Sequence, residues 1–169
     1  MNRKEKGFSL IELLIVVAII LIIAAIAIPN LLRAKIAANE SSAVGSMRTL
    51  NTASVNYYTS WGVQYPASMS VLGGPTNVIA TCTLAELIDA TLQGATTAAT
   101  AKSGYFFTYT GATATPAVNG CTGFQTYTIV SQPANVGQTG QRGFFTDQSG
   151  VIRYTTDGSA PTLASPALQ

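Results

Sequence analysis

The sequence predicts an α+β fold in which one long N-terminal helix is followed by a C-terminal antiparallel β-sheet. Three observations support this prediction. The run from Leu13 to Ile28 contains no polar residue, residues 30–61 continue with apolar positions at helical spacing, and the last third holds segments rich in aromatic and β-branched residues. With 169 residues, the chain has room for one domain and a membrane segment.

The apolar run extends from Phe8 to Ile28 and is interrupted only by Ser9 and Glu12. As a helix it would be roughly 31 Å long, which is enough to cross a bilayer. Glu12 is the informative residue, because a carboxylate in an apolar helix is costly unless a partner pairs with it.

The residues MNRKEKG, followed by FSLIE and the apolar run, resemble the type III leader of type IV prepilins and of the pseudopilins of type II secretion. The resemblance is specific over residues 1 to about 35. It implies the pilin fold, with the second half of the helix packed on the sheet. It also implies that a prepilin peptidase cuts after Gly7 and methylates the new N-terminus at Phe8. Glu12 would then be the fifth residue of the mature chain.

Two other interpretations of the N-terminus compete with this one. An ordinary signal peptide would be cut after Ala25-Ile26-Ala27, but it has no reason to carry Glu12. A plain signal anchor is the second. Counting positive charges supports a cytoplasmic N-terminus only weakly, because Arg33 and Lys35 follow the run.

The position of Glu12 suggests a role in assembly. Cleavage would create a positive amine on Phe8, and Glu12 lies four residues later, in the first helical turn. Glu12 could therefore pair with its own amine in the membrane, or with the amine of a neighbour in a helical bundle. Because a neighbour's amine reaches it at only one axial offset, the pair could set the register.

Four segments follow from this interpretation. They are a leader at residues 1–7, a transmembrane or filament-core helix at 8–29, an amphipathic helix at 30–61 and a globular head at 62–169. Pro29 lies inside the helical pattern and should kink it, since proline removes a backbone hydrogen bond. Arg33, Glu40, Arg48 and Asn51 fall largely off the apolar face of the second half, which is formed by Leu32, Ile36, Ala43, Met47, Leu50, Ser54, Tyr57 and Trp61.

Turn and cap signals divide the head. Gly62 is a plausible end for the long helix, and Thr83-Leu84-Ala85-Glu86 has the pattern of a capping box, which predicts a short helix from Leu84 to about Leu92. Residues 94–104 are small and polar, and we expect a surface loop. Strands are predicted at 105–110, 124–131, 143–147 and 151–155, with a hairpin turn at 148–150 and an extended tail along one sheet edge.

The sequence contains two cysteines and no histidine. In an exported head, Cys82 and Cys121 would form a disulfide, worth roughly 4 kcal/mol for a closed loop of about 39 residues. Two free buried thiols are the alternative. Asp147 and Asp157 could contribute to a calcium loop, although both also fit as turn-forming residues, and we expect the latter.

Charge and composition exclude several function classes. The leader accounts for the whole formal charge of +2, so the mature chain would be neutral, and no basic patch suggests nucleic-acid binding. No group of acids is spaced for general acid–base catalysis, so we expect neither an enzyme nor a cofactor.

The expected function is therefore that of a type IV pilin subunit. The resemblance implies a single-pass protein of the bacterial inner membrane, with a cytoplasmic N-terminus before assembly, that polymerises with itself into a surface pilus for adhesion or twitching motility. The implied partners are a prepilin peptidase, an inner-membrane platform protein, an assembly ATPase and an outer-membrane secretin. A major pseudopilin of type II secretion and a membrane-anchored monomeric binding domain are the alternatives.

Overall fold

The computed structural model describes residues 8–62, 64–74, 79–118 and 120–168. The chain divides into two compact units, Met1–Lys35 and Ile36–Gln169. We describe each unit by itself and call the second unit the head.

Helix α1 spans Leu10–Trp61 and runs through both units. It begins two residues later than the expected Phe8 and continues through Pro29, whose missing N–H leaves one helical hydrogen bond unmade. The kink at Pro29 stays a prediction. The helix ends as predicted, because Gly62 adopts a φ of +65°, a left-handed conformation that glycine accepts at low cost.

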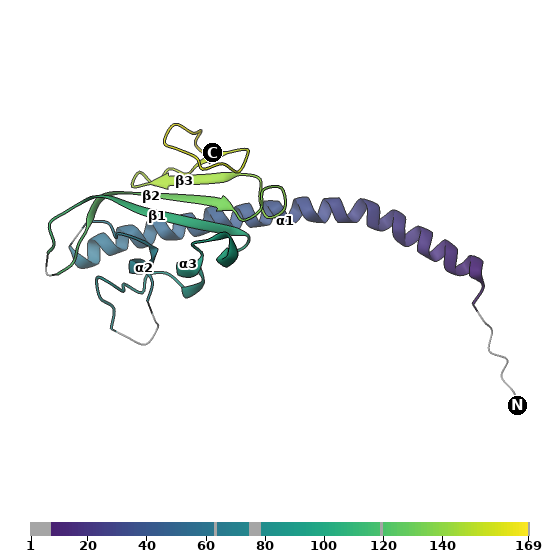
Figure 1. Cartoon of the computed structure of the whole chain (residues 1–169), viewed down its shortest axis with the longest axis horizontal. Coiled ribbons are helices and arrows are strands. Elements are labelled where there is room, and N and C mark those ends of the chain that lie inside the picture. Colours follow the sequence, from purple (N-terminus) through teal and green to yellow (C-terminus); the bar gives the residue numbers. More distant parts are fainter. Residues whose placement is uncertain (1–7, 63, 75–78, 119, 169) are drawn as a thin grey trace, which may run out of the picture. The chain divides into compact units, whose positions relative to one another are not determined.

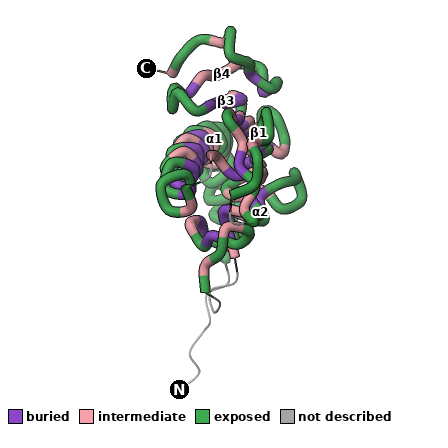
Figure 2. The backbone as a smooth tube through the Cα atoms, turned by 90° about the vertical axis from the view of Figure 1, so that its left-hand side faces the viewer, coloured by how far each residue is buried: buried purple, intermediate pink, exposed green. Residues whose placement is uncertain are grey.

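The core of the head lies between α1 and the sheet (Figure 2). Met47, Leu50 and Tyr57 of α1 are fully buried against aromatic and aliphatic residues of the strands. The core strand residues are Tyr105, Phe107, Tyr109, Tyr127, Ile129 and Phe144. The predicted apolar face is thus confirmed within the head. Leu32, which the sequence placed on the same face, is 43% exposed.

Four antiparallel strands form one sheet in the order β1-β2-β3-β4 (Figure 1). They are β1 (Tyr105–Ala114), β2 (Phe124–Pro133), β3 (Gly143–Asp147) and β4 (Arg153–Thr155). All four predicted strands are present. Alternation along β1 places Tyr105, Phe107 and Tyr109 in the core, because successive side chains of a strand point to opposite faces.

Both outer edges of the sheet are covered. At the β1 edge, the N–H of Phe107 donates to the carbonyl of Ala95 (2.8 Å), and that of Gly111 donates to Ala67 (3.3 Å). At the β4 edge, Ala167 of the tail pairs with Arg153, as the sequence predicted. Such cover protects unpaired strand edges from uncontrolled association.

The predicted helix from Leu84 to Leu92 is wrong. Leu84 instead closes a tight turn with Thr81, and Glu86 has a φ of +52°, which a right-handed helix does not allow. The short helices are α2 (Met69–Leu72) and α3 (Ala90–Gly94). Asp89 caps α3 by accepting a hydrogen bond from the N–H of Leu92 (2.9 Å).

One smaller feature of the head also differs from the sequence expectation. The loop at residues 94–104 contains a short 3₁₀ helix, η1 (Ala98–Thr100). A capping box between Thr97 and Thr100 stabilises it. The sequence hid this turn because its residues are small and lack an apolar period.

Candidate functional site

The predicted cleavage and methylation residues, Gly7 and Phe8, precede α1 in the sequence, and the predicted assembly residue Glu12 lies in its first turn. Gly7 lies outside the described residues, and Phe8 is 80% exposed. The backbone N–H of Ser9 donates to Oε2 of Glu12 at 2.9 Å. Ser9 precedes the first helical residue, so Glu12 caps its own helix from the third helical position.

This cap was missed in the sequence, although Ser9-Leu10-Ile11-Glu12 has the spacing of a capping box. The cap satisfies one of the free N–H groups at the helix start and places a negative charge beside the positive end of the helix dipole. Oε2 of Glu12 accepts the hydrogen bond of this cap, whereas Oε1 makes no hydrogen bond within the described residues. That oxygen remains available to a positive amine.

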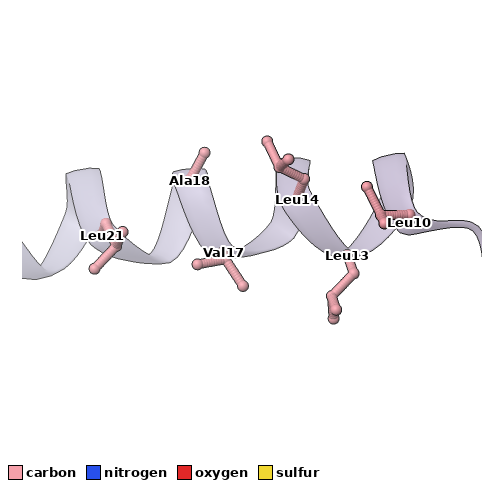
Figure 3. Close-up of a pocket in the computed structure, with 6 residues that line it drawn as sticks. All are labelled: Leu10, Leu13, Leu14, Val17, Ala18 and Leu21. Carbon is pink, nitrogen blue, oxygen red and sulfur yellow. The ribbon is translucent and has the colours of Figure 1, made fainter.

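The apolar side chains after Glu12 have no cover within the described part of their unit. Of the described residues, one helix is long and apolar enough to cross a membrane. Leu10, Leu14 and Ala18 form one row on it, and Leu13, Val17 and Leu21 form a second (Figure 3). A shallow groove of about 370 Å³ lies between the rows. Within each row the side chains are four residues apart. Such rows form ridges that pack into the grooves of a neighbouring helix.

The head carries the predicted disulfide between Cys82 and Cys121, whose Cα atoms are 5.8 Å apart. It joins the segment before α3 to the loop that enters β2. The Tyr57 hydroxyl donates to the carbonyl of Cys82 at 2.7 Å, which fastens the same segment to α1. The disulfide therefore links the loop that enters β2 to a segment that is itself bonded to α1 close to its C-terminal end.

Asp147 and Asp157 each form a local turn. Oδ1 of Asp147 accepts hydrogen bonds from the N–H and hydroxyl of Ser149, and Oδ1 of Asp157 accepts from the N–H (3.1 Å) and hydroxyl (2.6 Å) of Ser159. The hydrogen bonds from Ser159 lower the pKa of Asp157. In the described residues, no three His, Cys, Asp or Glu side chains gather as a metal site would require. The turn-forming interpretation accounts for both residues.

Glu40 is a structural residue whose role the sequence did not indicate. The sequence placed Glu40 off the apolar face of the helix, yet its side chain is only 7% exposed. Oε1 accepts the backbone N–H groups of Gln141 and Arg142, both at 3.0 Å, and Oε2 accepts Nε of Arg142 at 2.8 Å. Glu40 thus ties α1 to the residues that enter β3. Its partners lie about 100 positions away, so no local pattern could reveal it.

Comparison with known proteins gives a match to the model of the prokaryotic N-terminal methylation motif over residues 2–28. A stretch of 58 residues is 45% identical to the type IV major pilin protein PilA of Myxococcus xanthus and covers 34% of this chain and 26% of that protein. A stretch of 39 residues is 64% identical to the type IV wide pilus major component PilA4 of Thermus thermophilus and covers 23% of this chain and 30% of that protein.

The chain therefore carries the methylation motif of prepilins and is similar to type IV major pilins over about a third of its length. The match spans less than a third of either relative. No solved structure matches the chain.

Proposed function

We propose that this chain, with its prepilin motif and its likeness to type IV major pilins, is the structural subunit of a type IV pilus. The observation that carries the proposal is the apolar first part of α1, where no residue from Leu13 to Ile28 is buried and where the first turn presents a carboxylate. Both named relatives are pilus components, which favours a pilus over a type II secretion pseudopilus and a structural over a catalytic role.

The exposed helix requires an apolar environment at every stage. Fully burying one Leu, Ile or Val side chain is worth about 1.5–3 kcal/mol, and most side chains from Leu13 to Ile28 are more than half exposed. Lipid provides this cover before assembly, and the helices of neighbouring subunits provide it afterwards. Between apolar helices in lipid, hydrophobicity gives no net drive, so packing and polar pairing decide association.

Glu12 supplies the polar pairing. After cleavage behind Gly7, the Phe8 amine carries a positive charge next to the helix start. Oε2 of Glu12 stays on the N–H of Ser9, and Oε1 accepts the amine of a neighbouring subunit. The charge-assisted pair offsets the cost of burying the carboxylate, a cost of several kcal/mol. The cap orients the carboxylate of Glu12. The pairing of this carboxylate with the neighbour's amine therefore fixes the register of neighbouring helices.

The remaining assignments follow from the same proposal. A prepilin peptidase cleaves the leader, which lies on the cytoplasmic side of the membrane, and methylates Phe8. An inner-membrane platform protein, an assembly ATPase and an outer-membrane secretin then move the subunit from the inner membrane into the surface fibre. Adhesion and twitching motility are the functions proposed for that fibre.

Mass spectrometry of fibres sheared from the cell surface tests the proposal. The expected N-terminus is N-methylated Phe8. A subunit that still starts at Met1, or a soluble head trimmed near Ala27, would contradict it. Processed Phe8 in filaments confined to the periplasm would indicate a pseudopilin, and processed Phe8 in a protein that never associates would indicate a membrane-anchored binding domain.

Glu12→Gln tests the assembly step. The variant should be cleaved normally, because Gly7 and Phe8 are unchanged, and yet should give few or no fibres, because a neutral amide cannot neutralise the amine. Ser9→Ala is the matched control, since its backbone N–H still donates to Glu12, and it should assemble. Normal fibres from Glu12→Gln would show that the pair does not drive assembly.

A further inference from the structure

Two charged side chains of the head have no partner within the described residues. Glu40 pairs with Arg142, Asp89 with Lys102, and Arg153 donates to the carbonyl of Ser165. Asp147 and Asp157 are bound by serines in their own turns. Arg48 and Glu86 are exposed, and neither side chain makes a hydrogen bond or ion pair in the described structure.

The two unpartnered charges lie at opposite edges of the sheet. Arg48 lines a groove of about 440 Å³ together with Arg142, which precedes β3, and Leu168, which bonds to Ile152 next to β4. Glu86 lies between α2 and α3, and the residues that flank this pair of helices, Ala67 and Ala95, accept hydrogen bonds from the β1 edge. Figure 1 shows α2 and α3 on one side of the strands and β3 with the C-terminal tail on the other.

We propose that Arg48 of one subunit pairs with Glu86 of the next subunit in the fibre. This inference rests on the proposed pilus function and identifies a contact between heads. Opposite charges on opposite edges of one molecule are complementary between copies. Such a contact joins two different surfaces, so it does not close into a dimer and can continue along a filament.

The base of the Glu86 side chain is held in place before any partner arrives. The N–H groups of its neighbours Ala85 and Leu87 donate to the carbonyls of Val71 and Leu72, both at 2.8 Å. Between them, Glu86 keeps a φ of +52°, which residues with a side chain rarely adopt. A charge on a fixed base loses less conformational freedom on binding, which favours a specific contact.

A glycine beside Arg48 supports close approach of a partner. Gly45 lines the same groove and lies in the interior of α1, where glycine destabilises a helix relative to alanine. A Cβ atom at Gly45 would meet nothing within 4 Å, so no described residue of the head requires a glycine there. A neighbouring subunit that packs closely on this part of α1 would require it.

Charge reversal in the full-length protein tests the pair. Arg48→Glu and Glu86→Arg should each lower the yield of sheared fibres by about tenfold or more, as expected for close interfacial charge pairs. The double variant should restore the yield, because the pair is rebuilt with the charges exchanged. Lys102→Glu and Asp157→Arg are matched controls, since both residues are charged, lie on the head and have partners in their own chain. Both should assemble normally.

Crosslinking gives a second measurement that does not depend on yield. The native cysteines are already bonded to each other, so Arg48→Cys combined with Glu86→Cys provides two new thiols. A short bis-maleimide should convert fibres of this variant into a ladder of trimers and longer species. Either cysteine alone should give no ladder.

Reversal variants that assemble like the wild type, a double variant that stays defective, or intact double-cysteine fibres without a ladder would each overturn the pair. Wild-type fibres bearing methylated Phe8 would leave the proposed function standing in those cases. If the wild type forms no fibre, the proposed function and this inference fall together.

Discussion

Replacing Glu40 should be among the most destabilising single changes in the head. Glu40→Ala removes an acceptor from two backbone N–H groups and from the Arg142 guanidinium, and the carboxylate it removes is only 7% exposed. Breaking a buried ion pair from one side costs about 3–5 kcal/mol. Arg142 is 37% exposed and can regain part of its hydration, so we expect about 3 kcal/mol.

Glu40→Gln refines the test. The amide oxygen can still accept the two backbone N–H groups, but its NH₂ group then faces the donor Nε of Arg142. We expect a loss of about 2 kcal/mol, since a hydrogen bond to a charged group is worth about 1.5–3 kcal/mol. Glu86→Gln is the matched control, because Glu86 is exposed and makes no side-chain hydrogen bond within the described residues, and it should change stability by less than about 0.5 kcal/mol.

The assay is guanidinium unfolding of the full-length chain in detergent micelles, followed by the fluorescence of Trp61, the single tryptophan. A midpoint shift at constant slope reports the change in free energy of unfolding. If Glu40→Ala loses less than about 1 kcal/mol, Glu40 and Arg142 form only the equivalent of a surface ion pair, and the anchoring role of Glu40 is wrong.

Two further predictions concern the head. Cys82→Ser combined with Cys121→Ser should lower the free energy of unfolding by roughly 4 kcal/mol, because the disulfide closes a loop of 39 residues; an unchanged midpoint in the same assay would contradict this. Burial, followed by the nearby Tyr65 and Asp147 charges, raises the pKa of Tyr127 from 10.0 to about 12. The unfolded tyrosine therefore loses its proton first, so the contribution of Tyr127 to stability should be constant below pH 10.0 and fall between pH 10.0 and about 12. Unfolding midpoints measured across that range should fall less steeply for Tyr127→Phe, and equal slopes would assign the pH dependence to other groups.

The sequence determined the parts of this protein that depend on local patterns. An apolar run with helical spacing specifies a helix wherever it lies, and alternating aromatic and β-branched residues specify strands, so α1 and all four strands were predicted. The N-terminal motif is also local, and it alone indicated where cleavage, methylation and the assembly carboxylate would be.

Contacts between distant residues were decided only by the tertiary structure. Thr83 to Glu86 has the letters of a helix cap, yet bonds from Ala85 and Leu87 to α2 hold Glu86 in a left-handed conformation and the helix starts later. Glu40 is charged, and charged residues usually lie on the surface. Its side chain is nevertheless buried, and bonds to Gln141 and Arg142 compensate for its lost hydration. In both places, hydrogen bonds to remote backbone groups outweigh local propensity, which is worth under about 1 kcal/mol per residue.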